Sequence, residues 1–193
     1  MRPDPSLKAA TQLQRQAADD LHVALLKPSD APRYRALMLE AYELATDAFT
    51  STPEERVAEP ESFWINRIAD PSGMGAAFGA FAGGELVGTV AVEFSAKPKT
   101  RHKALVIGMY VSPQARGTGA GKALIEACIQ YATGKEGILV LNLTVTEGNA
   151  SAIGLYRSAG FVAFGTEPLA IATPRGFRAK VHMQRVIARG TAA

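Results

Sequence analysis

Cysteine and histidine are scarce in this sequence of 193 residues, which contains one Cys and three His. Cys128 has no partner for an internal disulfide, and we expect it to be a small buried apolar residue on one side of a helix. The histidines, His22, His102 and His182, lie far apart, with no Cys or carboxylate at metal-ligand spacing. We therefore expect no metal site.

Long apolar runs are absent as well. No uninterrupted apolar segment approaches the roughly 18 residues that a membrane span needs. Residues 1–6 also lack the apolar core of a signal peptide. We expect a cytoplasmic protein without a membrane partner.

Excess charge of either sign is small, with 21 Lys and Arg against 18 Asp and Glu and a net charge of +3. The densest basic segment, residues 97–103, contains no Phe, Tyr or Trp. A groove for single-stranded nucleic acid combines basic and aromatic side chains. We therefore expect a solvated connector there and no nucleic-acid partner, while the mild positive charge favours an anionic ligand.

Length and composition fit one folded domain. Hydrophobic residues make up 47% of the chain and charged residues 20%, which is typical of globular proteins. We expect a single domain over residues 21–187, preceded by a flexible polar arm over residues 1–20 and followed by a short tail over residues 188–193.

A Gly-Gly pair predicts a β-hairpin. Gly83 and Gly84 separate two apolar runs, residues 76–82 and 85–94, and supply the positive φ angles that a tight turn requires. We expect these two strands to pair in antiparallel fashion.

A strand, a glycine-rich loop, a helix and a second strand follow over residues 104–112, 119–133 and 138–145. Such a unit is a right-handed crossover, so its two strands should be parallel. The expected fold class is α/β, with a central mixed, mostly antiparallel sheet flanked by helices. The other expected elements are a strand at 21–26, helices near 30–45, 63–68 and 149–159, a turn-rich segment at 50–60, and strands at 161–164 and 178–186.

The loop before the helix carries Gly117, Gly119 and Gly121 within five positions. Glycine lets the backbone turn tightly and approach a ligand because no Cβ stands in the way. The first N–H groups of the helix have no partner within it, and the positive end of the helix dipole lies behind them. This arrangement predicts a phosphate-binding site.

Spacing excludes two common nucleotide-binding loops. A Walker A loop, G-x-x-x-x-G-K-[ST], aligned on Gly121 and Lys122 would need glycine at Arg116 and a hydroxyl at Ala123. A dinucleotide fingerprint, G-x-G-x-x-G, puts Lys122 or Leu124 where the third glycine belongs.

Two sequence blocks resemble the GNAT superfamily of N-acetyltransferases. Arg116–Gly121 matches the pattern R/Q-x-x-G-x-G/A of the family's acyl-coenzyme A pyrophosphate loop, and Asn149–Phe161 is similar to its N-x-x-A-x-x-L-Y-x-x-x-G-F signature. The resemblance is specific over residues 103–165 and looser over residues 21–187. It implies that the strand ending near Val111 splays from the next parallel strand, leaving a gap for the pantetheine arm.

The resemblance further implies transfer of an acetyl group from the co-substrate acetyl-CoA to a primary amine of a small molecule or peptide. The backbone of Met109 and Val111 would pair with the pantetheine amides, and the N–H groups of residues 116–121 would hold the pyrophosphate. The basic side chains of Arg116 and Lys122 would add positive charge beside the pyrophosphate. The implied cofactor-binding residues are Met109, Tyr110, Val111, Arg116, Gly117, Thr118, Gly119, Ala120, Gly121, Lys122 and Asn149.

Two residues are candidates for the catalytic proton transfers. Tyr156 resembles the family's general acid, which protonates the leaving thiolate, and Glu93 is our candidate for the base. His102, with an imidazole pKa of about 6.5, is an alternative base. Each site residue also has a structural alternative: Tyr156 as a core aromatic, Glu93 as an exposed strand carboxylate, Asn149 as a helix cap, and Arg116 as a solvated charge.

A non-catalytic acyl-CoA-binding or regulatory domain of the same fold is the main alternative function. No motif identifies the acceptor amine, and we expect its specificity to lie in residues 40–75 and 165–180. The family is often dimeric, so the resemblance also allows a homodimer.

Overall fold

The computed structural model describes residues 20–187, so the predicted arm up to residue 19 and the predicted tail over residues 188–193 lie outside the described residues. Within this range the strands form one seven-stranded sheet in the order β1-β2-β3-β4-β5-β7-β6. The strands are β1 (His22–Leu25), β2 (Gly75–Ala82), β3 (Glu85–Phe94), β4 (Lys103–Val111), β5 (Val140–Thr146), β6 (Val162–Thr173) and β7 (Gly176–Val186).

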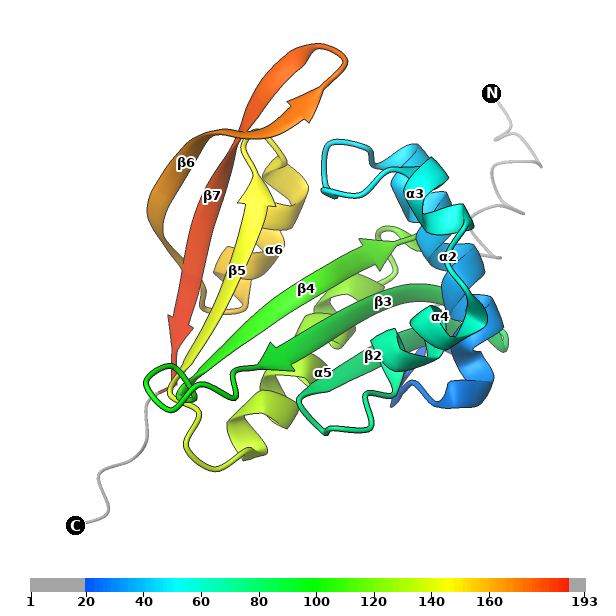
Figure 1. The fold of residues 1–193 in the computed structure, drawn as a ribbon, viewed down its shortest axis with the longest axis horizontal. Helices are drawn as coiled ribbons and strands as arrows, with labels where there is room; N and C mark the ends of the chain where they lie inside the picture. Colours follow the sequence, from blue (N-terminus) through cyan, green and yellow to red (C-terminus); the bar gives the residue numbers. More distant parts are fainter. Residues whose placement is uncertain (1–19, 188–193) are drawn as a thin grey trace, which may run out of the picture.

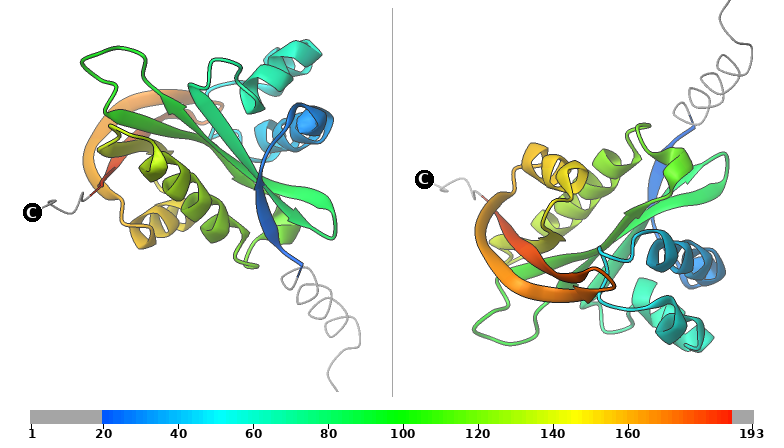
Figure 2. Two further views of the ribbon diagram at one scale, coloured as in Figure 1. Left: turned by 90° about the horizontal axis from the view of Figure 1, so that it is seen from below. Right: turned by 90° about the horizontal axis from the view of Figure 1, so that it is seen from above.

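Helices cover both faces of this sheet (Figures 1 and 2). The helices on one face are α2 (Ala31–Leu44), α3 (Pro53–Val57) and α4 (Glu61–Ile68), and those on the other are α5 (Ala120–Gly134) and α6 (Ala150–Ser158). Among the strands of residues 20–187, only β4 and β5 pair in parallel, and every other neighbouring pair is antiparallel. The expected mixed, mostly antiparallel sheet flanked by helices is therefore confirmed, as is the 83–84 hairpin.

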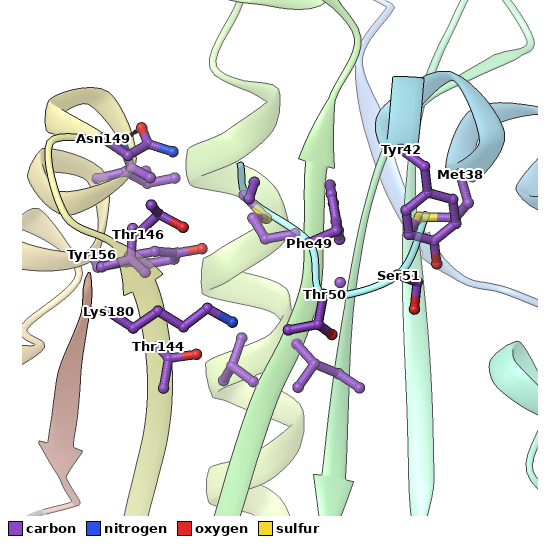
Figure 3. Close-up of a pocket in the computed structure, with 18 of the residues that line it drawn as sticks. Met38, Tyr42, Phe49, Thr50, Ser51, Thr144, Thr146, Asn149, Tyr156 and Lys180 are labelled. Carbon is purple, nitrogen blue, oxygen red and sulfur yellow. Dashed lines mark hydrogen bonds between the residues drawn. The ribbon is translucent and has the colours of Figure 1, made fainter. Parts of the chain in front are cut away.

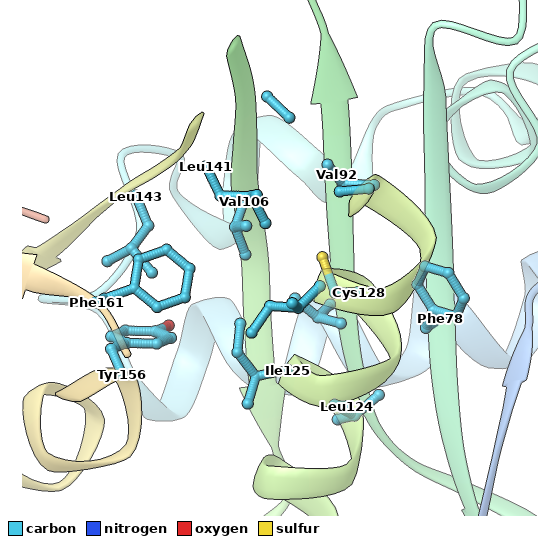
Figure 4. Close-up of a cluster of buried hydrophobic side chains, with 14 of the residues drawn as sticks. Phe78, Val92, Val106, Leu124, Ile125, Cys128, Leu141, Leu143, Tyr156 and Phe161 are labelled. Carbon is cyan, nitrogen blue, oxygen red and sulfur yellow. The ribbon is translucent and has the colours of Figure 1, made fainter. Parts of the chain in front are cut away.

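Two apolar clusters hold the layers together, one on each face of the sheet. Leu124, Ile125 and Cys128 of α5 are fully buried against the strands (Figure 4). On the other face, Trp64 of α4 packs edge-on against Tyr34 of α2, with 6.1 Å between ring centroids. The predicted burial of Cys128 is confirmed, and burial raises the pKa of its thiol to about 12. That thiol therefore stays protonated and unreactive near neutral pH.

The parallel strands β4 and β5 separate soon after they meet. Their pairing is limited to three residue pairs that end at Leu105 and Asn142, and beyond this point the strands diverge (Figure 1). A β-bulge lies on the diverging part of β4, where Gly108 and Met109 together face a single residue of β3. Gly108 has φ +62°, a conformation that favours glycine. The splayed strand pair that the family resemblance implied is therefore present.

The first of the last two strands, β6, extends well beyond the predicted residues 161–164, whereas β7 closely matches the predicted residues 178–186. β6 and β7 form one long hairpin. The first eight residues of β6 are exposed, and its pairing register with β7 shifts between Glu167 and Ile171. With no buried face along most of its length, β6 shows no alternation of apolar and polar residues from which its extent could be predicted.

The segment at 50–60 contains a helix where the sequence suggested only turns. The Glu55 N–H donates to Thr52 Oγ1 at 3.3 Å, and the Thr52 N–H donates to the Glu55 carboxylate at 2.9 Å. This is a capping box, and Pro53 occupies the first helical position. These local signals specify α3 in spite of the turn-rich composition.

Candidate functional site

A cavity of about 310 Å³ opens where β4 and β5 diverge. Its walls are the divergent parts of these strands, α6, one residue of β7, and segments of α2, α3, α4 and the loop over residues 45–52 (Figure 3). The lining residues are Met38, Tyr42, Ala48, Phe49, Thr50, Ser51, Arg56, Arg67, Val106, Ile107, Gly108, Met109, Thr144, Val145, Thr146, Asn149, Ala152, Leu155, Tyr156 and Lys180. We call this the splay cavity.

Tyr156 lies between the hydrophobic core and the splay cavity. Its ring packs at 6.0 Å from the ring of Phe161 within the α5–α6 cluster, while its hydroxyl points into the cavity (Figure 3). Within residues 20–187 that hydroxyl has no hydrogen-bond partner. Burial, and secondarily the nearby Cys128, raises the pKa of Tyr156 to about 12. The phenol is therefore a proton donor that stays protonated at neutral pH and is free to bind a ligand.

The predicted phosphate loop has the backbone conformation that a cradle requires. Gly117 and Gly119 have φ values of +80° and +93°, which ordinary side chains rarely adopt. Gly119 directly precedes α5, which begins at Ala120. A Cβ on Gly121 would lie 3.3 Å from the side chain of Leu155, so this position is where α5 approaches α6. The loop thus places the N-terminus of α5 at the wide end of the splay.

The polar side chains of the loop are held by the loop itself or turned outward. Arg116 Nε donates to the Val111 carbonyl at 3.2 Å, and Thr118 Oγ1 donates to the Ala115 carbonyl at 2.7 Å. Lys122 is exposed, with its amino group 3.8 Å from the carboxylate of Glu126. Arg116 is exposed and hydrogen-bonded to the end of β4, and its contact with a cofactor stays a prediction.

The sequence predicts that Asn149 either caps a helix or contacts the cofactor, and the structure shows that it caps α6. Its Oδ1 accepts from the N–H of Ala152 at 3.1 Å. Because the oxygen is engaged in the cap, the Nδ2 group is available at the edge of the splay cavity, which Asn149 lines (Figure 3). The cap role is confirmed, and contact with a cofactor stays a prediction.

Neighbouring residues of β4 have side chains on different faces of the sheet. Met109 lines the splay cavity, but the ring of Tyr110 is buried beside α2, where its hydroxyl donates to Glu40 Oε1 at 2.9 Å. Burial and the Glu40 carboxylate raise the pKa of Tyr110 to about 12. The side chain of Tyr110 is therefore engaged on the α2 face of the sheet, and Tyr110 pairs with Thr89 of β3, so its contact with a cofactor stays a prediction.

Neither candidate base lies in the splay cavity. Glu93 lines an adjoining cavity of about 460 Å³, which shares Arg67 and Ile107 with the splay cavity. His102 lies beside the start of β4, where its carbonyl accepts from the N–H groups of residues 139 and 140. Since β4 spans nine residues, or about 30 Å, His102 lies at the end of the strand remote from the phosphate loop.

Sequence reasoning missed three basic side chains that line the splay cavity: Arg56 on α3, Arg67 on α4 and Lys180 on β7. They lie within or beside the ranges expected to control acceptor specificity, but no local motif marks them. Only the folding of α3, α4 and β7 around the gap brings them together. No cluster of three or more His, Cys, Asp or Glu side chains within residues 20–187 could hold a metal ion. No helix in the same range is long and apolar enough to cross a membrane.

A gap between parallel strands, with a glycine loop at its wide end and a tyrosine hydroxyl inside it, is the arrangement that the family resemblance implied. A model of the acetyltransferase (GNAT) family matches residues 38–161, more than half of the chain. The chain therefore belongs to the GNAT acetyltransferase family, whose members use acetyl-CoA as co-substrate. No curated protein sequence matched the chain.

Many solved structures share this fold. A GCN5-related N-acetyltransferase from Kribbella flavida is 26% identical with a TM-score of 0.74, covering 88% of this chain and 99% of its own. A ribosomal-protein-alanine N-acetyltransferase from Brucella melitensis is 25% identical with a TM-score of 0.71, covering 86% and 99%. A phosphinothricin acetyltransferase from Sinorhizobium meliloti in complex with AcCoA has a TM-score of 0.77, and the match covers 90% of this chain and 92% of that protein's chain. At 22% identity it supports the fold alone.

Proposed function

We propose that this protein is an N-acetyltransferase that moves the acetyl group of acetyl-CoA to a primary amine of a small molecule or peptide by direct attack. The observation that carries this proposal is the unpartnered hydroxyl of Tyr156 inside the gap between β4 and β5. An acyl transfer needs a proton donor at the leaving thiolate. The Tyr156 hydroxyl makes no hydrogen bond to any of residues 20–187, so it is available for that role.

The phosphates and the thioester would occupy opposite ends of the gap. The pyrophosphate would bind the N–H groups of residues 116–121 at the start of α5, with the helix dipole behind them. The pantetheine arm would run along the open edge of β4, where the backbone of Met109 and Val111 is unpaired by β5. The Nδ2 group of Asn149 would donate to the cofactor from the other side.

The reaction would proceed in one attack and two proton transfers. An alkylamine has a pKa of about 10.4, so near pH 7 only roughly one molecule in a few thousand is neutral and nucleophilic. The neutral nitrogen attacks the thioester carbonyl, and the oxyanion accepts a hydrogen bond from a backbone N–H at the bulge near Met109. The carbon–sulfur bond then breaks, the thiolate takes a proton from Tyr156, the nitrogen gives its proton to a base, and the phenolate of Tyr156 regains a proton from solvent.

We propose Glu93, acting through water, as the base that receives the amine proton. It lies on β3 in the adjoining cavity, which meets the splay cavity at Arg67 and Ile107. A carboxylate one cavity away reaches the amine only through intervening water. Glu93→Gln should therefore lower kcat/KM most strongly at low pH, where few amine molecules are already neutral.

Incubation with acetyl-CoA and a broad amine panel tests the proposed function, with release of the coenzyme A thiol as readout. The chain's own thiol does not contribute to the signal, because Cys128 is fully buried. Acetylation of any amine above the hydrolysis rate supports the proposal. Tight binding of acetyl-CoA by calorimetry with no transfer to any amine would instead favour a non-catalytic acyl-CoA-binding domain.

Replacing Thr146 with valine should loosen the loop that covers the splay cavity. Thr146 Oγ1 donates to the carbonyl of Asp47, tying the loop over residues 45–52 to β5. We expect the free energy of unfolding in urea to fall by about 1 kcal/mol and KM for the amine to rise. Thr144→Val is the matched control, since Thr144 lines the same cavity but its hydroxyl makes no hydrogen bond within residues 20–187. Equal effects of the two substitutions would contradict this role for Thr146.

A further inference from the structure

The charges that line the splay cavity are all of one sign. Arg56, Arg67 and Lys180 contribute to its wall, and none of the described residues that line it is an Asp or Glu. Clustering cations without counter-charges costs free energy unless an anion joins them. A cavity built only for a plain alkylamine, which arrives as a cation, would have the opposite sign.

Arg56 is the one cation of the three that already has a carboxylate partner. Its guanidinium lies 3.1 Å from Glu59 Oε1 and donates to Ser51 Oγ at 2.7 Å. These contacts fix Arg56 at the junction of α3 with the loop over residues 45–52. The charge that is free for a ligand must come from the other two side chains.

Arg67 is half-buried and carries a charge with no ion pair of its own within residues 20–187. Burial acts to lower the pKa of its guanidinium, but the nearby Tyr34, Tyr42 and Glu93 outweigh it and leave that pKa raised. Arg67 also lies 5.9 Å from the ring centroid of Phe63. The side chain is thus held in place and fully charged at the boundary between the two cavities.

Lys180 points from β7 into the gap beside Tyr156 (Figure 3). Its register partner on β6 is Glu167, but that carboxylate accepts from His182 at 3.0 Å instead. Lys180 therefore has no ion pair among the described residues. Arg67 on α4 and Lys180 on β7 come from elements on different sides of the gap, and both line the splay cavity.

The cofactor does not account for these two cations. Its pyrophosphate belongs to the loop over residues 116–121, and no residue of that loop lines the splay cavity. The parts of acetyl-CoA that would occupy the gap are the pantetheine amides and the thioester, which are neutral. An anion beside Tyr156 must therefore come from the acceptor.

We infer that the acceptor of this enzyme is a small amino acid-like molecule, an amine that also bears a carboxylate, and that Arg67 and Lys180 hold the carboxylate. This inference rests on the proposed function. The carboxylate orients the molecule so that its amine faces the thioester near Tyr156. A peptide N-terminus, which lacks a carboxylate next to its amine, is expected to be a poor acceptor.

Matched acceptor pairs test the inference. The common L-amino acids are each compared with their primary amides, and kcat/KM is measured at saturating acetyl-CoA. We expect the preferred amino acid to exceed its amide by about tenfold or more, the scale of a charge-assisted hydrogen bond. The comparison is stringent, because an amino acid amide loses its ammonium proton more readily and so has more of the neutral amine.

Charge removal supplies the second arm of the test. Arg67→Met and Lys180→Met should each raise KM for the preferred amino acid by about tenfold, with KM for its amide and Kd for acetyl-CoA nearly unchanged. Arg175→Met is the control, because it makes the same change in net charge at the exposed turn between β6 and β7.

The possible results separate the inference from the proposed function. If amides or peptide N-termini are acetylated as well as amino acids are, and both variants affect acids and amides equally, the inference is wrong while acetyl transfer stands. If no amine of any kind is acetylated although acetyl-CoA binds, the proposed function is wrong and the inference is lost with it.

Discussion

Replacing Tyr156 with phenylalanine should lower kcat by about 100-fold or more, the usual contribution of a positioned general acid. The ring would still pack against Phe161, so the core is kept. Without the hydroxyl, the thiolate must leave unprotonated or take a proton from water. Kd for acetyl-CoA, measured by calorimetry, should change by no more than about tenfold, because one neutral hydrogen bond contributes about 0.5–1.5 kcal/mol to the cofactor's binding energy.

The pH profile adds a second readout for Tyr156. A general acid acts only while it is protonated, and the pKa of this phenol is raised to about 12 by burial and by Cys128. Its ionisation should therefore cause no loss of activity as pH rises through the neutral and mildly alkaline range. We expect the substitution to lower the whole profile of kcat without changing its shape.

Tyr131→Phe is the matched control for this experiment. Tyr131 lies on α5 and packs against Phe78 and Phe94, away from the splay cavity. Its loss of a hydroxyl should leave kcat unchanged. A parallel loss of kcat and of acetyl-CoA binding in Tyr156→Phe would show instead that the tyrosine is only structural.

Replacing Gly119 with alanine should weaken acetyl-CoA binding by about tenfold or more. Gly119 has φ +93°, where a Cβ costs about 1–2 kcal/mol of backbone strain. No protein atom lies within 4 Å of the added Cβ, so the new methyl group occupies space that we assign to the pyrophosphate. Calorimetry measures Kd, and urea unfolding reports the accompanying loss of stability.

Gly134→Ala separates the effect of the cradle from a general effect of adding a methyl group. Gly134 ends the same helix, has no positive φ, and also faces open space. This substitution should leave Kd unchanged and keep or slightly raise stability, since alanine is the better helix former. Equal affinities of the wild type and Gly119→Ala for acetyl-CoA would refute the placement of the pyrophosphate.

The glycine loop, the start of α5 and the cap at Asn149 could be predicted from the sequence because their determinants are local. The strand, the glycine loop and the start of α5 are consecutive, and the cap at Asn149 lies only a few residues before Tyr156. Short-range backbone preferences specify the glycine loop and the helix cap. The spacing of the glycines could also be compared, position by position, with known nucleotide-binding motifs. The hairpin at Gly83 and Gly84 was predictable for the same reason.

The basic residues that we assign to the acceptor could not be predicted from the sequence, because they come from distant segments. Arg67 lies on a short helix, and Lys180 belongs to a strand whose partner β6 shows no alternating pattern. Whether a given lysine faces solvent or the gap depends on the pairing register of β7 with β5 and β6. The placement of Glu93 one cavity away from Tyr156 was beyond sequence analysis for the same reason.

The early separation of β4 from β5 gives this sheet two unpaired edges in its own interior. An exposed edge strand invites pairing with other chains and so promotes aggregation. Here the two edges face each other and converge on the last pair, Leu105 and Asn142, so the opening suits a single extended molecule. A pantetheine arm seated there would act as a missing strand that joins the two halves of the sheet. Resistance to unfolding would then increase with the concentration of the coenzyme, by the mass action that links any native-state ligand to stability.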